Sequence, residues 1–306
     1  MPRSDDSTLD EAGRRAVEAR AKAALDRAGA WDRYPTPVDD VVAAANLKVA
    51  VSSAFDLNHI MAFLADKAAD AAKILKSALS KIWGVLDVED GIIHIDDTVT
   101  KSRQAFLKLH ETGHHELPTH RRLFRLFQDS EKTLDPAVAD LFEREANNFA
   151  RYALFQGNRY GSMAADMAMA IKTPMNLASK FGASIYAACR EFARTNHREC
   201  LVYVLEPVEF VPGDGFRAVV RRAEPSPSFR AHFGEPKVLE ITPDHPLGRV
   251  VPIGRKLTKP TAMRVRDLNG EQVDVIAEAF DTTHNIIILL YTARTLRPAT
   301  TVIAAC

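Results

Sequence analysis

The chain has 306 residues, of which 46% are hydrophobic and 26% are charged, the balance of an ordinary soluble globular protein. Its 40 lysines and arginines equal its 40 aspartates and glutamates, so net charge gives no argument for a nucleic-acid or membrane partner. Its three cysteines are widely spaced, and no apolar run approaches the roughly 20 residues that cross a bilayer. We therefore expect a cytoplasmic protein with free thiols and no membrane partner.

The first part of the chain alternates predicted helices with short strands. An alanine-rich segment of mixed charge at residues 8–30 predicts a solvent-facing helix. A strand is predicted at 47–51, followed by a long helix at 57–83, where apolar side chains recur at helical spacing. Two apolar runs within 85–95 flank a Glu-Asp-Gly turn and predict a β-hairpin.

The next predicted helix carries the sequence HETGH, in which the two histidines lie one helical turn apart on the same face. A hydrolytic zinc site has three protein ligands and keeps a fourth position for water. We assign His110 and His114 as ligands and Glu111 as the general base that takes the proton of the water. The expected metal is Zn²⁺, although Mn²⁺ or Co²⁺ accept the same ligands.

A helix that Asp135-Pro136 can open offers two candidates for the third ligand, Glu143 and Glu145. Because they are two positions apart, only one of them can face the metal. Glu143 is preferred because Asn147 then lies one turn further on the same face, where it can support a ligand, while Glu145 is the alternative. His94, His115 and His120 are interpreted as surface or packing residues.

The remaining chain divides into two regions with different sequence patterns. Residues 173–197 predict two short helices around a turn at Gly182, and residues 198–306 consist of short β-rich runs between glycines and prolines. The predicted fold class is α+β. The predicted domains are an N-terminal helix (1–30), a mostly helical, zincin-like metallopeptidase domain with a small sheet (31–172), a helix-turn-helix-like segment (173–197) and a β-rich domain (198–306).

Three separated motifs resemble the ImmA/IrrE family of zinc metallopeptidases. These are the strand GIIHID at 91–96, the helix FLKLHETGH at 106–114 and the helix EREANNFA at 143–150. The resemblance supports His110, His114 and Glu143 as metal ligands, and it favours Glu143 over Glu145. It also implies that Glu111 acts as the base of an endopeptidase. The predicted helix at 57–83 is an apparent insertion relative to the family.

The IrrE branch of this family is similar in a further way, because it combines a peptidase core with a helix-turn-helix-like segment and a C-terminal GAF-like domain. The segment 173–197 has some basic character from four residues within it or directly before it: Lys172, Lys180, Arg190 and Arg194. A GAF-like fold for 198–306 rests on this analogy of architecture alone.

The resemblance implies a function in gene regulation. Members of the family make a limited cut in a helix-turn-helix (XRE-type) repressor and so derepress stress or phage-defence genes. We expect such a repressor as the substrate, and DNA or a small-molecule signal as an activator. Gly91, Ile93 and Ile95 are predicted to form an edge strand that holds the substrate backbone. The alternative is a non-catalytic, zinc-containing sensor or DNA-binding transcriptional regulator.

Overall fold

The computed structural model describes residues 7–51, 84–87, 91–95, 98–121 and 136–293. The predicted helix at 57–83 lies outside these residues. The chain forms two compact units that interleave in sequence. Among the described residues, one unit comprises those within 4–163 and 176–188, and the other comprises those within 164–175 and 189–306. Both helices and strands are present, which confirms the predicted α+β class. The predicted domain limits stay predictions.

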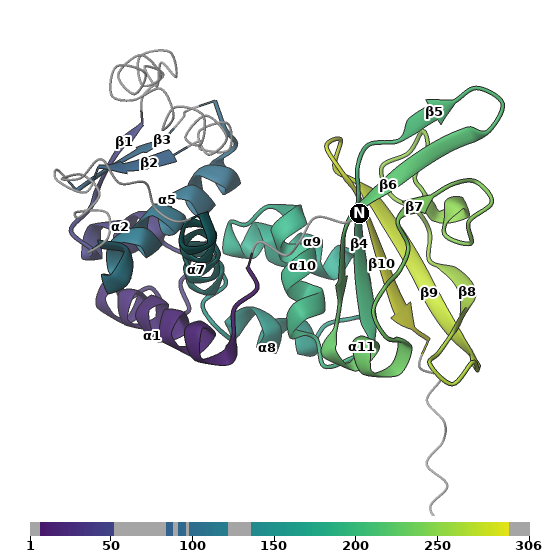
Figure 1. The fold of residues 1–306 in the computed structure, drawn as a ribbon, viewed down its shortest axis with the longest axis horizontal. Helices are drawn as coiled ribbons and strands as arrows, with labels where there is room; N and C mark the ends of the chain where they lie inside the picture. The colour runs from purple at the N-terminus through teal and green to yellow at the C-terminus, as the bar shows by residue number, and fades with distance from the viewer. Residues whose placement is uncertain (1–6, 52–83, 88–90, 96–97, 122–135, 294–306) are drawn as a thin grey trace, which may run out of the picture. The chain divides into compact units, whose positions relative to one another are not determined.

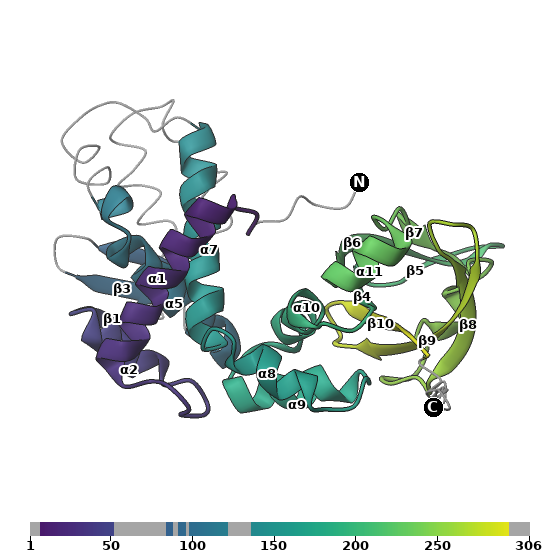
Figure 2. The ribbon, with the colours of Figure 1, turned by 90° about the horizontal axis from the view of Figure 1, so that it is seen from below.

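Three helices form the centre of the first unit, and Figures 1 and 2 show them side by side. They are α1 (Glu11–Ala28), α5 (Lys101–Glu116) and α7 (Pro136–Leu154). Asp10 caps α1 by accepting a hydrogen bond from the Gly13 amide at 2.7 Å. The shorter helix α2 (Val38–Ala44) contacts both α1 and α5. These helices bury one another's apolar faces and so hold α5 and α7 in a fixed relation.

A small three-stranded sheet lies against α5 in the order β1-β3-β2. Its strands are β1 (Lys48–Val51), β2 (Gly84–Asp87) and β3 (Ile92–Ile95). Strand β2 runs antiparallel to β3, which confirms the predicted hairpin, and β1 runs parallel to β3. The sheet thus joins two segments that are far apart in sequence.

The prediction that Gly91, Ile93 and Ile95 form an edge strand is wrong. Strand β3 is the central strand of this sheet, with β1 on one side and β2 on the other, and the Gly91 carbonyl accepts a hydrogen bond from the Lys48 amide at 2.9 Å. Ile93 and Ile95 are fully buried. The physical reason is that β3 already has a partner along each side, so it has no free edge to offer to a substrate.

Three short helices follow α7 in sequence: α8 (Arg159–Ala165), α9 (Lys172–Phe181) and α10 (Ile185–Thr195). The last two flank a turn at Gly182, whose φ of 73° is the left-handed conformation that glycine adopts most easily. Two short helices around this glycine were predicted, and the structure confirms them.

The second unit contains a seven-stranded antiparallel sheet, which curls into a half-barrel (Figures 1 and 2). Six strands follow the order β5-β6-β4-β10-β9-β8, and β7 pairs with β6. The strands are β4 (Cys200–Leu205), β5 (Glu209–Val211), β6 (Gly215–Pro225), β7 (Glu240–Ile241), β8 (Thr261–Arg266), β9 (Gln272–Asp281) and β10 (Ile286–Thr292). A β-rich C-terminal region is thereby confirmed, while its GAF-like character stays a prediction.

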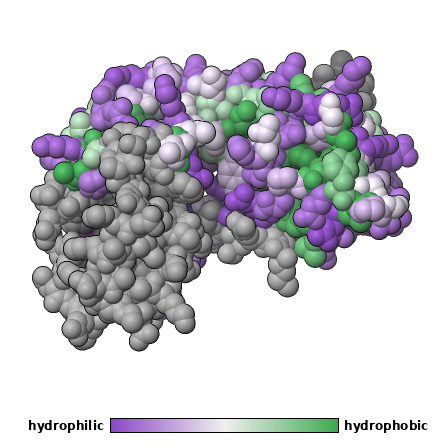
Figure 3. All heavy atoms as spheres, turned by 90° about the horizontal axis from the view of Figure 1, so that it is seen from above, coloured by the Kyte–Doolittle hydropathy of each residue, from purple (hydrophilic) through white to green (hydrophobic). Residues whose placement is uncertain are grey.

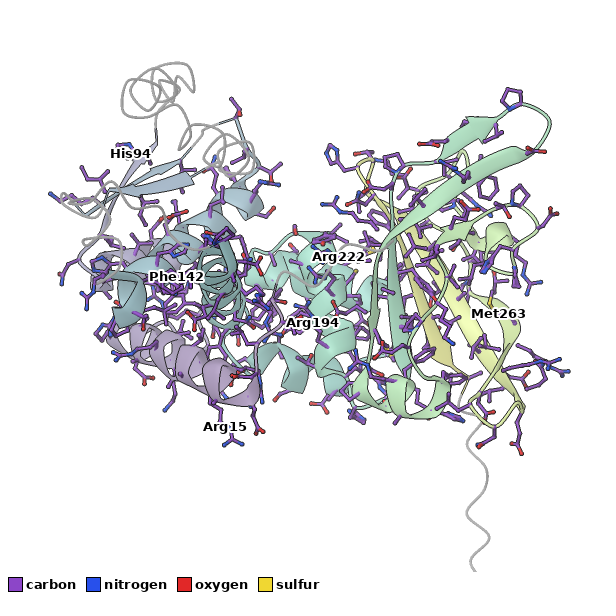
Figure 4. All side chains as sticks on the ribbon, viewed as in Figure 1. Arg15, His94, Phe142, Arg194, Arg222 and Met263 are labelled. Carbon is purple, nitrogen blue, oxygen red and sulfur yellow. The ribbon has the colours of Figure 1, made fainter. Side chains whose placement is uncertain are left out.

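The core of this sheet includes alternate residues of the central strands. Leu201, Tyr203 and Leu205 of β4 pack with residues of the neighbouring strands and with the short helix α11 (Pro227–Phe233). The 3₁₀ turn η1 (Gly248–Val250) adds Val250 to the same cluster. Met263 of β8, labelled in Figure 4, extends the cluster to the outer strand. This core belongs to the second unit alone.

Within the described residues, no helix is both long and apolar enough to cross a membrane. Among the coloured residues of Figure 3, hydrophilic side chains predominate, with small groups of hydrophobic ones among them.

Gly113 lies where α5 and α7 approach each other closely. A Cβ atom added at this glycine would lie 3.1 Å from both Cβ and Cγ of Phe149. Such contacts are tighter than those of ordinary side chains, so the absence of a side chain at Gly113 permits the two helices to approach closely.

We predict that Gly113→Val lowers the free energy of unfolding by about 1–3 kcal/mol, because the added methyl groups must displace Phe149. Urea unfolding measures this change. Ala19→Val on the exposed face of α1 is the control for the cost of a β-branched residue in a helix. Equal losses in the two variants would contradict a packing role for Gly113.

Candidate metal centre

Helix α5 presents His110 and His114 on one face, and α7 presents Glu143 opposite them. Both histidines are buried, whereas the Glu143 side chain is 61% exposed. The closeness of α5 and α7 at Gly113 brings the carboxylate of one helix within reach of the imidazoles of the other. The site is therefore closed on the histidine side and accessible to solvent beside the carboxylate.

The three side chains point their ligand atoms at a common position. The Nε2 atoms of His110 and His114 are 3.1 Å apart, and the Glu143 carboxylate oxygens lie 3.4 Å and 3.5 Å from them. Ligands about 2.0–2.1 Å from a tetrahedral zinc ion would be separated by about 3.3–3.4 Å. The spacing therefore fits one such ion, and within the described residues no other group of histidine, cysteine and acidic side chains has metal-binding geometry.

Glu111 follows His110 directly and is 9% exposed. It does not belong to the group of three ligand atoms. Its negative charge nevertheless reaches His110 and raises the pKa of that imidazole. Glu111 is thus a carboxylate whose charge acts on His110 without belonging to the ligand group.

Each histidine has a second polar partner on its other ring nitrogen. The Oδ1 atom of Asn147 lies 3.1 Å from Nδ1 of His110, as expected for a residue that supports a ligand. Nδ1 of His114 lies 3.0 Å from Nδ1 of His120. Both Nε2 atoms are thereby left to face the metal position.

His120 and Glu145 have places that the sequence did not indicate. His120 is fully buried and stacks on Phe142 of α7 with ring centroids 4.0 Å apart, so its interpretation as a packing residue is correct but incomplete. Its Nε2 atom also lies 2.7 Å from Oε2 of Glu145. Glu145, the alternative third ligand, thus directs its carboxylate to His120, and Glu143 occupies the position facing the two ligands.

Burial and the neighbouring charges separate the pKa values of the two histidines. Burial opposes a charge on His110, but the carboxylates of Glu143 and Glu111 outweigh it and raise the pKa of His110. For His114, burial prevails and lowers the pKa to about 4. Loss of hydration disfavours an ionised Glu143, yet hydrogen bonds from both histidines hold the pKa of this carboxyl well below its usual range.

The basic residues of the segment 173–197 are partly engaged within the protein. Arg190 donates a hydrogen bond to Glu224 of β6 at 3.1 Å, and Arg194 pairs with the same carboxylate at 2.9 Å. Both arginine side chains are largely buried, and Arg194 is labelled in Figure 4. Lys180 lies over the ring of Tyr34 at 4.7 Å. Arg190 and Arg194 therefore stabilise the second unit, and their guanidinium groups are not directed to an external phosphate.

Comparison with known proteins places the metal centre in a domain of the peptidase class. Residues 73–192 match the Peptidase_M78 family, described as the IrrE N-terminal-like domain. The matched range contains both histidines, Glu111 and Glu143. The metal-binding geometry and the family match thus agree on a metallopeptidase-type site.

The whole chain also resembles a solved structure titled "Mycobacterium tuberculosis transcriptional regulator". The TM-score is 0.52 at 10% sequence identity, and the alignment covers 90% of this chain and 87% of that chain. At this identity the likeness concerns the fold. A search of curated proteins by sequence found no match.

We predict that the two histidines of the metal-free protein titrate on opposite sides of the ordinary value of 6.5. In NMR titrations, His110 should keep its proton to higher pH, while His114 should stay neutral down to about pH 4. Because a ligand must lose its proton to bind a metal, zinc affinity should rise with pH as His110 deprotonates. A lower pKa for His110 than for His114 would contradict this electrostatic description.

Proposed function

We propose that the protein is a zinc-dependent endopeptidase that makes a limited, site-specific cut in a helix-turn-helix (XRE-type) transcriptional repressor. The observation that carries the catalytic part is the group formed by His110, His114 and Glu143, with Glu111 beside it in a domain that matches a peptidase family. A purely structural zinc site would need a closed set of four ligands. Within the described residues the group offers three ligands, and with the Glu111 carboxylate beside it this favours hydrolysis.

In this mechanism the chain holds the metal and moves one proton. His110, His114 and Glu143 would hold a zinc ion. As a Lewis acid, this ion would polarise the scissile carbonyl and lower the pKa of the attacking water. Glu111 takes the proton of that water and then delivers it to the nitrogen of the leaving amine as the peptide bond breaks. Asn147 keeps the His110 ring in orientation. Mn²⁺ or Co²⁺ can occupy the same ligands.

The choice of a repressor as substrate rests on the resemblance of the three motifs to the ImmA/IrrE family. We further propose that the C-terminal unit senses the activating signal, a small molecule or DNA, and that the protein acts in the cytoplasm in stress or phage-defence regulation. The engagement of Arg190 and Arg194 with Glu224 argues against DNA contacts through these two arginines of α10.

Cleavage of a repressor encoded beside this gene tests the proposal. We predict that the zinc-loaded protein cuts it at one site and that chelation stops the cut until zinc is restored. Glu111→Gln should retain zinc but cleave roughly 10²–10⁴-fold more slowly, because it loses general-base catalysis. Mass spectrometry of the products and single-turnover rates measure both effects.

Glu116→Gln is the matched control, since Glu116 ends the same helix but pairs with Arg27. It should cleave at the wild-type rate. Undiminished cleavage by Glu111→Gln would contradict the assigned base. Tight DNA binding by a His110→Ala, His114→Ala double variant, with no proteolysis by the wild type, would favour the alternative of a non-catalytic regulator.

A further inference from the structure

His120 and Glu145 form a chain of hydrogen bonds behind one metal ligand. The distances are 3.0 Å between the Nδ1 atoms of His114 and His120, and 2.7 Å between Nε2 of His120 and Oε2 of Glu145. His120 is fully buried, and the Glu145 side chain is 21% exposed. The chain therefore runs from the metal position through protein to a carboxylate at its far end.

Only one arrangement of protons lets His114 bind a metal through Nε2 while both contacts remain hydrogen bonds between neutral imidazoles. Nδ1 of His114 must then carry a hydrogen, which it donates to the lone pair on Nδ1 of His120. His120 in turn carries its hydrogen on Nε2 and donates it to the Glu145 carboxylate. Every donor has an acceptor in this arrangement, and the Nε2 lone pair of His114 faces the metal.

The position of His120 is also fixed from the side. Its ring stacks on Phe142, and its two ring nitrogens are aligned by His114 and Glu145. Glu145 and Phe142 both belong to α7, the helix that also carries Glu143. The helix that supplies the third ligand thus also orients the second one, through His120.

We propose that His120 and Glu145 are positioning residues of the metal centre. They fix the tautomer and the ring orientation of His114, and the Glu145 charge, transmitted through His120, makes His114 a stronger metal donor. The inference rests on the proposed metallopeptidase site and goes beyond it, because it assigns a role to two residues outside the ligand set. Outer partners of this kind typically contribute 10–100-fold in metal affinity.

Zinc affinity, measured by competition with a chromogenic chelator, tests the proposal without any substrate. His120→Phe keeps a ring that can stack on Phe142 but leaves the Nδ1 hydrogen of His114 without an acceptor. We predict roughly 10–100-fold weaker zinc binding. His120→Gln should recover part of the loss, since its amide oxygen can accept that hydrogen. Glu145→Gln should lose less zinc affinity than His120→Phe. Its amide oxygen can still accept the hydrogen of His120, so only the negative charge is lost.

A double variant separates this role from direct coordination by Glu145. If Glu145 acts through His120, the Glu145→Gln change should have no further effect on zinc affinity in the His120→Phe background. The visible absorption of the Co²⁺-loaded Glu145→Gln variant should also keep the intensity that is typical of a four-coordinate site. A further loss of affinity, together with a changed Co²⁺ spectrum, would show that Glu145 is itself a ligand and would overturn the proposal.

Gln156→Leu serves as the control for loss of a buried polar side chain, because Gln156 is fully buried and bonds to the segment around Asp32 and Thr36. It should lower thermal stability and leave zinc affinity unchanged. Wild-type affinity in both His120→Phe and Glu145→Gln would overturn the proposal and leave the proposed function intact. A wild-type protein that takes up no zinc would overturn both.

Discussion

The closeness of α5 and α7 is the constraint on which the site depends. Gly113 lies between His110 and His114 on α5, and a Cβ atom there would lie 3.1 Å from the Phe149 side chain of α7, closer than ordinary side-chain contacts. Because that side chain is missing, a carboxylate from α7 can reach two imidazoles of α5. The HETGH stretch therefore supplies two ligands and also packs closely against α7. Gly113, which lies between the two histidines, allows the third ligand on α7 to come close enough.

The packing of the same two helices also determines which acidic residue of α7 faces the metal position and which faces His120. Glu143 and Glu145 are two positions apart on α7 and direct their carboxylates to different partners. Glu143 faces the metal position, and Glu145 faces His120. Burial and the nearby charges then set the pKa values of the two ligand histidines: the carboxylates of Glu143 and Glu111 outweigh burial and raise the pKa of His110, whereas burial lowers that of His114. The electrostatics of the site is therefore a consequence of helix packing.

Local patterns in the sequence predicted the parts of the site that depend on local spacing. Two histidines four positions apart share a helix face, and Asn147 lies one turn beyond Glu143, so these relations follow from helix geometry. The hairpin and the paired helices around Gly182 have equally local signals. His120 has none. It lies beyond Leu117, where α5 has ended, and its contacts with His114 and Glu145 depend on the path of the chain after that helix.

The error about the β3 strand has the same origin. Its sequence shows an apolar strand beside a turn, but the parallel partner β1 comes from a distant segment, and pairing between distant segments leaves no local pattern. Zinc K-edge X-ray absorption of the loaded protein tests the central claim most directly. The account predicts a four-coordinate ion with nitrogen and oxygen neighbours at about 2.0–2.2 Å, two of them imidazoles. A spectrum that requires sulfur ligands, or an ion without imidazole scattering, would contradict it.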